Sequence, residues 1–333
     1  MAFYVDSGGG GGGGVLPGYV GRQPGQFSSV LFSLSDLRLS RLAEEEEGWQ
    51  GWPRGAELFT HIKPWVAIVS RAKETSCCPG CFRPGRAPDP DIDCRDCGLV
   101  SYCSWACRAR DDLHHLECRH LARAGRLPVR DEVRVMVRAL GKLLDSADDR
   151  GDLLAGGGEG DQVPGRKDLR RFSELLSHKE DFLKSKQKTE DIKLLYDETE
   201  EFLDDEMPSF TTFLEVLGRL YINGFEMCDS AMETYGWAVY LGPSVLDHSC
   251  QPNCLVTFSG PRLTVSTMQK IPSLAEARIS YLNPKLPTQL RQQKLLENYY
   301  FSCICPKCSH SHHKGTKVDN HKNCSKNGKK RNK

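Results

Sequence analysis

The sequence lacks long apolar runs and any large excess of charge. No stretch of its 333 residues approaches the roughly eighteen consecutive apolar residues of a membrane-spanning helix. Its 45 lysines and arginines nearly balance its 44 acidic residues, and a net charge of +1 argues against bulk electrostatic capture of nucleic acid. We therefore expect no membrane insertion, and direct nucleic-acid binding stays open.

The N-terminus also lacks the charged segment, apolar segment and cleavage site of a secretory signal. This absence bears on the 15 cysteines, because disulfide scaffolds occur mainly in small secreted chains. Several of the cysteines instead form pairs with two residues between them. That spacing is typical of reduced thiolates on a metal.

The densest cysteine block lies between residues 78 and 118. Its candidate ligands are Cys78, Cys81, Cys94, Cys97, Cys103, Cys107, His114 and Cys118. Because zinc prefers sulfur and nitrogen donors in tetrahedral fours, eight ligands predict two closed sites with a structural role. His115 is an alternative to His114, and Cys77 is an alternative to Cys78.

Three later segments carry a second pattern: LGPSVLDHSCQPNC at 241–254, RISYL at 278–282 and CICPKC at 303–308. Together they resemble the SET domain of protein-lysine methyltransferases. The cysteine block upstream narrows the resemblance to the SET and MYND domain family, here as a truncated or divergent member without the C-terminal helical-repeat domain.

The resemblance implies an interleaved arrangement of zinc ligands in the MYND-type block. One ion is expected on Cys78, Cys81, Cys103 and Cys107, and another on Cys94, Cys97, His114 and Cys118. A third structural zinc is expected on Cys250, Cys303, Cys305 and Cys308, where it holds the post-SET segment over the pocket.

The expected fold is α+β, with a SET-type β-fold of short sheets interrupted by the MYND zinc module and a helical insert, and closed by the post-SET zinc segment. The predicted segments are a disordered glycine-rich N-terminus (1–51), the first SET strands (52–77), the MYND-type module (78–118), the helical insert (119–222), the SET core (223–285), the post-SET zinc segment (286–310) and a basic disordered tail (311–333).

Periodicity locates the main elements. A helix is predicted over 131–145, with Val133, Met136, Val137, Leu140 and Leu144 on its core face. Residues 151–168 are predicted to form a loop, and two or three helices are expected in 169–206. Further predictions are a helix capped by Ser209, a hairpin over 255–267 and a helix over 288–301. The resemblance implies that residues 223–228 and 278–282 each form a strand and that His178 lies on a helix.

The implied cofactor is S-adenosylmethionine, with Asn223, Asp247, His248, Phe301 and His178 as cofactor-binding residues. The family pair Asn-His is Asp-His in this chain, and an aspartate only accepts hydrogen bonds where an asparagine also donates. A carboxylate tolerates the ammonium and sulfonium of that cofactor. His248 is either a cofactor contact or a structural, satisfied histidine.

Tyr281 is the implied catalytic tyrosine, and Tyr299 and Phe301 are the implied walls of a lysine channel. The resemblance implies S-adenosylmethionine-dependent methyl transfer to lysine amines of histones or other proteins, in the nucleus and cytoplasm. It also implies that the MYND module binds proline-rich peptides.

The alternative function is a catalytically inactive zinc scaffold that binds proline-rich partners. Three departures from the family support it, of which Asp247 is one. No Arg-Gly-x-Gly-like cofactor loop precedes Gly55, and Leu274–Ala277 replaces the usual Gly-Glu-Glu-Leu.

Overall fold

The computed structural model describes residues 50–125, 129–145 and 170–309. The N-terminal segment predicted to be disordered lies outside the described residues except for positions 50 and 51, as do the predicted 151–168 loop and the predicted tail from 311. Within the described residues, no helix combines the length and apolar character needed to cross a membrane.

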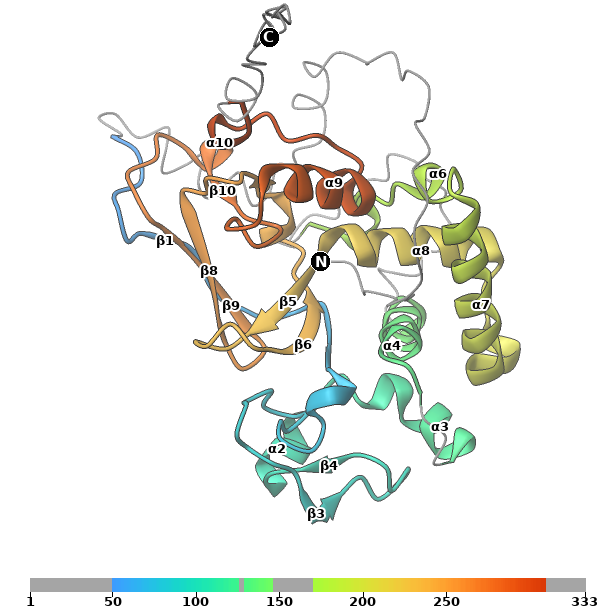
Figure 1. Ribbon diagram of the computed structural model, residues 1–333. Coiled ribbons are helices and arrows are strands. Elements are labelled where there is room, and N and C mark those ends of the chain that lie inside the picture. The colour runs from blue at the N-terminus through green and yellow to red at the C-terminus, as the bar shows by residue number, and fades with distance from the viewer. Residues whose placement is uncertain (1–49, 126–128, 146–169, 310–333) are drawn as a thin grey trace, which may run out of the picture.

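Short strands and helices alternate along the described chain (Figure 1). The strands are β1 (Glu57–Ile62), β2 (Val66–Val69), β3 (Asp89–Asp93), β4 (Ser101–Tyr102), β5 (Gly224–Cys228), β6 (Thr234–Val239), β7 (Asp247–His248), β8 (Cys254–Ser259), β9 (Arg262–Thr267) and β10 (Arg278–Ile279). The helices are α2 (Trp105–Arg110), α3 (His115–Ala124), α4 (Asp131–Asp145), α6 (Lys179–Phe182), α7 (Lys186–Leu203), α8 (Phe210–Asn223), α9 (Thr288–Tyr299) and α10 (Pro306–Ser309).

Three small sheets form the β part of the fold: β1-β9-β8, β2-β6-β5 and a parallel pair of β7 and β10. The β8–β9 hairpin is confirmed, and its turn contains Gly260 with φ of +57°, a conformation that favours glycine. A fourth sheet, β3-β4, belongs to the cysteine block. The α+β class is therefore confirmed.

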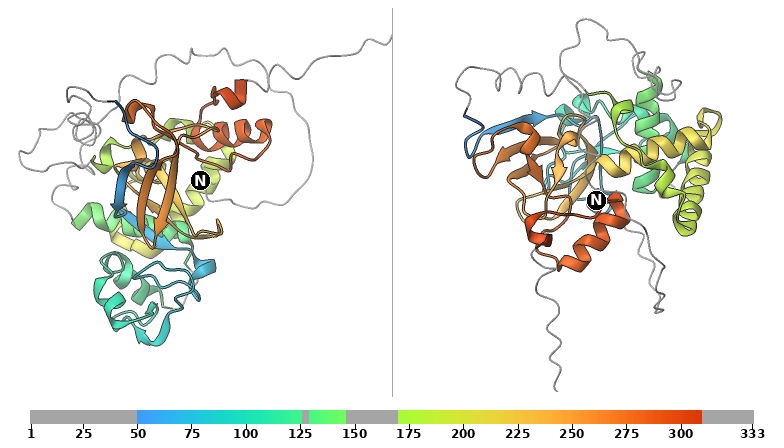
Figure 2. Two further views of the ribbon diagram at one scale, coloured as in Figure 1. Left: turned by 90° about the vertical axis from the view of Figure 1, so that its left-hand side faces the viewer. Right: turned by 90° about the horizontal axis from the view of Figure 1, so that it is seen from above.

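The layers are arranged around helix α4. The cysteine block with β3, β4 and α2 lies at one end, the helices α7 and α8 lie to one side, and the sheets lie to the other (Figures 1 and 2). Helices α9 and α10 cover the sheets at the end opposite the cysteine block (Figure 1). Two of the predicted segment boundaries fall inside helices, at 118/119 in α3 and at 222/223 in α8.

Helix α4 has the predicted bounds but a wider buried surface than a single stripe. Every residue from 133 to 140 is buried, including Arg134 and Arg138. The prediction that Leu144 belongs to the core is wrong, because its side chain is 41% exposed while Leu143 is buried instead. The helix is covered on one side by β2 and on others by α3, α7 and α8.

Helix α8 begins as predicted, since the Ser209 side chain accepts a hydrogen bond from the backbone N–H of Thr212. Its other end differs from the prediction. Asn223 was expected in the following strand, but it is the last residue of α8 and β5 starts at Gly224. Helix α9 likewise ends at Tyr299, before the predicted residue 301.

Candidate metal centres and active-site cleft

The first cluster consists of Cys78, Cys81, Cys103 and Cys107, whose sulfur atoms lie within 4.8 Å of one another. The Cys81–Cys103 and Cys103–Cys107 sulfur separations are 3.9 and 3.6 Å. Zinc–sulfur bonds of about 2.3 Å in a tetrahedron give sulfur separations of about 3.8 Å. The cluster therefore has the dimensions of a closed zinc site, and it contains Cys78 rather than Cys77.

The second cluster consists of Cys94, Cys97, His114 and Cys118. The sulfur atoms of Cys94 and Cys118 are 3.6 Å apart, and Nε2 of His114 is 3.4 Å from the sulfur of Cys97. His114, rather than His115, therefore faces the cysteines. His115 lies outside the cluster as the first residue of α3.

The third cluster joins two distant segments, because Cys250 meets Cys303, Cys305 and Cys308. Its sulfur atom lies 3.9 Å from that of Cys303 and 3.6 Å from that of Cys308. These three clusters fit three zinc ions, and each has four ligands, so none leaves a position for substrate.

One cysteine of each cluster has a pKa below the ordinary thiol value: Cys78, Cys97 and Cys305. A hydrogen bond from Cys81 is the main cause that lowers the pKa of Cys78. Burial opposes ionisation of Cys97 and Cys305, yet hydrogen bonds lower the pKa of both, from His114 to Cys97 and from the Cys308 backbone to Cys305. Since the thiolate is the metal ligand, each cluster holds a sulfur prepared for a cation.

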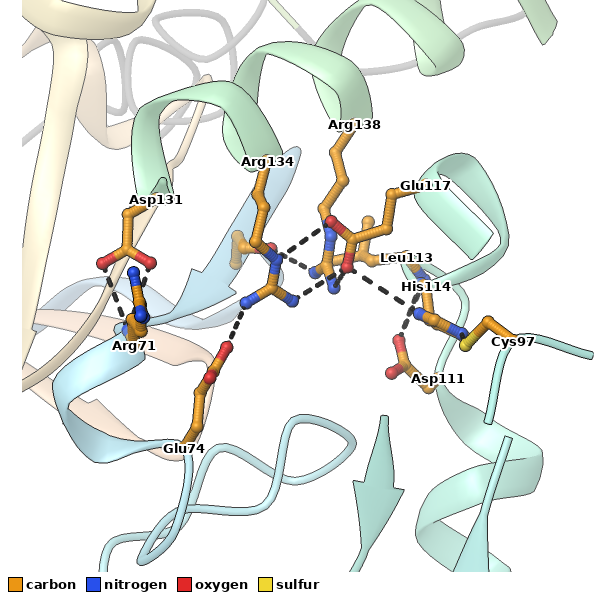
Figure 3. A network of polar contacts seen from close by, with 11 residues as sticks. Arg71, Glu74, Cys97, Asp111, Leu113, His114, Glu117, Asp131, Arg134 and Arg138 are labelled. Carbon is orange, nitrogen blue, oxygen red and sulfur yellow. Dashed lines mark hydrogen bonds and ion pairs between the residues drawn. The ribbon is translucent and has the colours of Figure 1, made fainter. Parts of the chain in front are cut away.

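Glu117 lies behind the second cluster, fully buried between α3 and α4 (Figure 3). Its carboxylate accepts hydrogen bonds from Arg134 at 2.9 and 3.2 Å and from Arg138 at 2.6 Å. One of its oxygens is 3.7 Å from Nδ1 of His114. Burial alone would raise the pKa of Glu117, but the two arginines hold it well below its usual range.

The HSC-x-PNC segment is held against β10 by Asn253. The Asn253 side chain accepts from the backbone N–H of Arg278 at 2.7 Å and donates to the carbonyl of Glu276 at 2.8 Å. The backbone N–H of Ser249 donates to the carbonyl of Ile279 at 2.9 Å. These bonds fix β7, which carries Asp247 and His248, beside β10 at the start of the RISYL segment.

An aromatic group gathers where these segments meet. Tyr281 lies with its ring centroid 5.0 Å from that of Tyr299, 5.2 Å from that of His248 and 6.5 Å from that of Phe301. The residues predicted as catalytic and channel-forming are thus brought together. RISYL is mostly not a strand, however, because β10 ends at Ile279 and Tyr281 follows in a turn.

The hydroxyl of Tyr281 donates to the carbonyl of Leu246 at 2.6 Å, and burial raises its pKa above the ordinary value. The phenol therefore stays protonated at neutral pH. The imidazole of His248 links Tyr281 to the third cluster, since Nδ1 accepts from the Tyr281 N–H at 3.0 Å and Nε2 is 3.2 Å from the sulfur of Cys250. Burial, aided by Arg291, lowers the pKa of His248 to about 4, so the ring is neutral at physiological pH.

Asp247 is paired with a cation. Its carboxylate is 3.7 Å from the guanidinium of Arg278, its partner in the parallel β7–β10 register, and its side chain is 61% exposed. Arg278 also donates to the carbonyls of Ala275 and Ala277. The chain therefore offers a carboxylate beside a guanidinium at the position where the family has a neutral amide.

His178 and Asn223 lie around a neighbouring aromatic, Tyr300. The His178 ring stacks on Tyr300 with centroids 5.4 Å apart, and it precedes the single-turn helix α6 rather than lying within a helix as predicted. The Asn223 amide donates to the carbonyls of Leu176 and Arg219 at 3.0 and 2.8 Å. Asn223 thus fastens the His178 segment to α8.

An open cleft of about 320 Å³ lies beside the third cluster. Its lining residues are His248, Ser249, Arg278, Phe301, Ser302, Cys303, Ile304, Cys305 and Pro306. It combines aromatic, aliphatic and charged groups, as small-molecule sites do. Of the predicted cofactor residues, His248 and Phe301 line this cleft, Asp247 adjoins it through Arg278, and His178 and Asn223 do not line it.

Several residues of these sites were not predicted, among them Glu117, Arg134, Arg138, Arg291 and Tyr300. Arg291 is almost completely buried on α9, with its guanidinium 3.6 Å from the sulfur of Cys308. Tyr300 has φ of +61°, and this turn directs its ring to His178 while Tyr299 and Phe301 face Tyr281. The sequence places Arg134 and Arg138 on the polar face of the 131–145 helix, with Asp131 and Lys142, and so gives no signal that they are buried.

No protein-family model matches the chain. Among curated proteins, "Histone-lysine N-methyltransferase SMYD3" of Mus musculus is 26% identical over 264 residues, which cover 77% of this chain and 56% of the relative. "Histone-lysine N-methyltransferase ASHR1" of Arabidopsis thaliana is 25% identical over 261 residues, covering 77% and 51%. "SET domain and MYND-type zinc finger protein 6" of Schizosaccharomyces pombe is 24% identical over 221 residues, covering 66% and 41%.

The α+β fold, the three cysteine clusters and these similarities agree. The chain is similar to SET and MYND domain lysine methyltransferases, in agreement with the sequence resemblance. It spans about half the length of the curated relatives it matches.

Proposed function

We propose that the chain is a protein-lysine N-methyltransferase that uses S-adenosylmethionine and acts on lysine side chains of histones or other proteins. The observation that carries the proposal is the meeting of Tyr281, Tyr299 and Phe301 beside the cleft next to the third cluster. The relatives named above are lysine methyltransferases or SET and MYND proteins, which supports the same activity.

The cleft has groups that suit S-adenosylmethionine. Asp247 and Arg278 present opposite charges 3.7 Å apart, which complement the ammonium and carboxylate of a methionine end. Phe301 and His248 offer ring faces to an adenosine or a sulfonium. When bound, this cofactor supplies a methyl group activated by a sulfonium.

The protein's main task is to present a neutral lysine amine. A lysine with a pKa near 10.4 is almost wholly protonated at pH 7 in water, but burial and a nearby positive charge both lower that pKa. Tyr281, Tyr299 and Phe301 would exclude water around the side chain and align its amine lone pair with the methyl group. Orientation of the reactants then lowers the barrier, with no side-chain acid–base pair involved.

Tyr281→Phe tests the role of Tyr281. If its hydroxyl acts on the amine or the transferring methyl group, methyl transfer to a panel of histone and non-histone peptides should fall, or the degree of methylation should change, at nearly constant cofactor affinity. Equal rates and product distributions in wild type and variant would overturn that role. A wild-type protein that methylates none of the peptides and binds no cofactor would instead contradict the proposed activity.

We also propose that the three clusters bind three structural zinc ions, with the ligands given above. Their sulfur spacing and full sets of four ligands support this stoichiometry. Metal analysis of reduced, folded protein should return three zinc ions per chain, and a value of one or none would contradict the assignment.

The proposed protein partners include proline-rich peptides that bind the MYND-type module. Trp105 on α2 is 56% exposed with the Arg108 guanidinium 5.5 Å from its ring centre, and exposed aromatics commonly receive polyproline segments. Trp105→Ala should weaken binding of a proline-rich peptide without changing zinc content. The proposed location is the nucleus and cytoplasm, which fractionation of cells tests directly.

A further inference from the structure

The cysteine block is joined to the rest of the molecule by charges rather than by a purely apolar contact. Glu117 and Arg138 have no exposed surface, and Arg134 is nearly as buried. Buried charges are retained only when they are paired, and this carboxylate is shared between both guanidinium groups (Figure 3). The three side chains therefore form one unit.

This unit reaches a zinc ligand at one end and the SET strands at the other. The Glu117 carboxylate lies 3.7 Å from Nδ1 of His114, whose Nε2 faces the sulfur of Cys97. Arg138, bonded to the same carboxylate, donates at 2.6 Å to the backbone carbonyl of Ala67 in β2. Two side chains, Glu117 and Arg138, thus lie between the second cluster and β2, the strand that pairs with β6.

Metal-bound histidines commonly direct their second ring nitrogen to a carboxylate, which fixes the ring and strengthens the ligand. Nδ1 of His114 is buried and has no hydrogen-bond partner within normal distance, and the Glu117 carboxylate is its neighbouring ion-pair group. Zinc on Nε2 leaves the proton on Nδ1, where it faces this carboxylate.

We propose that Glu117 is a positioning residue that couples the second zinc site to the SET core. It orients His114 for the metal and, through Arg138, holds α4 against β2. Loss of zinc from this site therefore loosens α4 and β2 as well as the cysteine block. The proposal requires zinc at the second cluster and is independent of methyl transfer.

The first test measures zinc release to a chromophoric chelator from Glu117→Gln. One of three zinc equivalents should leave about 10- to 100-fold faster than in wild type, and the other two should be unchanged. Adding Cys97→Ser should abolish that fast equivalent while the third cluster keeps its zinc, which assigns the fast equivalent to the cysteine block. The matched control is Glu215→Gln, a carboxylate on α8 that pairs with Lys179 and Arg219 away from the clusters.

Glu117→Gln takes the carboxylate partner from buried Arg138 and leaves Arg134 with Glu74 alone, so a second variant keeps the test usable if this one fails to fold. Glu117→Met combined with Arg134→Met and Arg138→Met removes all three charges at similar volume. This variant should fold and still release one zinc equivalent faster. Release of all three equivalents at the wild-type rate by a folded variant would overturn the positioning role.

Hydrogen exchange tests the coupling itself. Cys97→Ser should increase hydrogen exchange in residues 66–69 and 131–145 when the charged unit is intact. In the triple methionine variant, the same substitution should increase exchange in these residues much less. Unchanged exchange in 66–69 after the loss of that zinc would overturn the coupling. Wild-type protein with fewer than three zinc ions would instead count against the zinc assignment.

Discussion

The second and third clusters are both buried groups of four ligands, but the protein surrounds them differently. Behind the second cluster, the Glu117 carboxylate bonds to Arg134 and Arg138 of α4, and Arg138 also bonds to the backbone of β2. Beside the third, a single cation, Arg291, faces the sulfur atoms, and His248 leads on to Tyr281. The groups behind the second cluster join it to neighbouring parts of the fold, whereas the groups beside the third cluster join it to a candidate active site.

The largest effect is expected from loss of the zinc ion at the second cluster. Cys97→Ser removes one ligand, and a structural zinc contributes an apparent binding free energy of about 10–16 kcal/mol that is also folding energy. The cysteine block should unfold while the third cluster keeps its ion. Zinc analysis with circular dichroism checks this, and a variant that retains three ions would refute the ligand assignment.

The next effect concerns the charges behind that cluster. Glu117→Gln should destabilise the chain by about 3–5 kcal/mol, because buried Arg138 loses its carboxylate partner and Arg134 keeps only Glu74. The triple methionine variant should lose much less unfolding free energy than Glu117→Gln. Urea unfolding measures both, with Glu215→Gln as the control at about 1 kcal/mol or less, since its pairs are partly exposed. If Glu117→Gln were as stable as Glu215→Gln, the buried charged unit would contribute little to the free energy of unfolding.

Arg291 is expected to matter to the third cluster alone. Four thiolates on a divalent ion carry excess negative charge, which the buried guanidinium offsets. Arg291→Met should therefore lower zinc affinity there by about 10- to 100-fold. Gln293→Ala, an exposed change on the same helix, is the control. Metal competition that finds no difference between the two variants would contradict this role.

The smallest effect is expected for the stability of Tyr281→Phe. The change removes one hydrogen bond, from the hydroxyl to the carbonyl of Leu246, worth about 1 kcal/mol. Since burial raises the pKa of this phenol above its ordinary value, its ionisation should leave no inflection in the methyl-transfer rate between pH 6 and about 9. A melting-temperature scan and a pH–rate profile provide the measurements.

The sequence allowed the local features to be predicted and missed those that depend on tertiary packing. Ligand spacing identified the clusters because a Cys-x2-Cys turn is a local structure. The periodicity of 131–145 gave the bounds of α4 but misplaced Leu144. Asn223 was predicted to lie in a strand because the family motif places residues 223–228 in a single strand. In the structure it ends α8, and its amide donates to the carbonyls of Leu176 and Arg219.

The charged unit escaped prediction for a physical reason. Arg134 and Arg138 look like the solvated positions of an amphipathic helix, and only the approach of α3 on one side and β2 on the other buries them. Tyr300 escaped because a positive φ at a tyrosine is set by its surroundings rather than by local preference.

Equilibrium binding of S-adenosylmethionine to the zinc-loaded chain tests the proposed function most directly. Calorimetry should give saturable binding of one molecule per chain, and Asp247→Asn together with Arg278→Met should weaken it because the paired charges at the cleft are lost. Adenosine, which lacks the charged methionine end, should bind wild type more weakly and respond little to those changes. Absence of saturable S-adenosylmethionine binding by folded protein carrying three zinc ions would contradict the account.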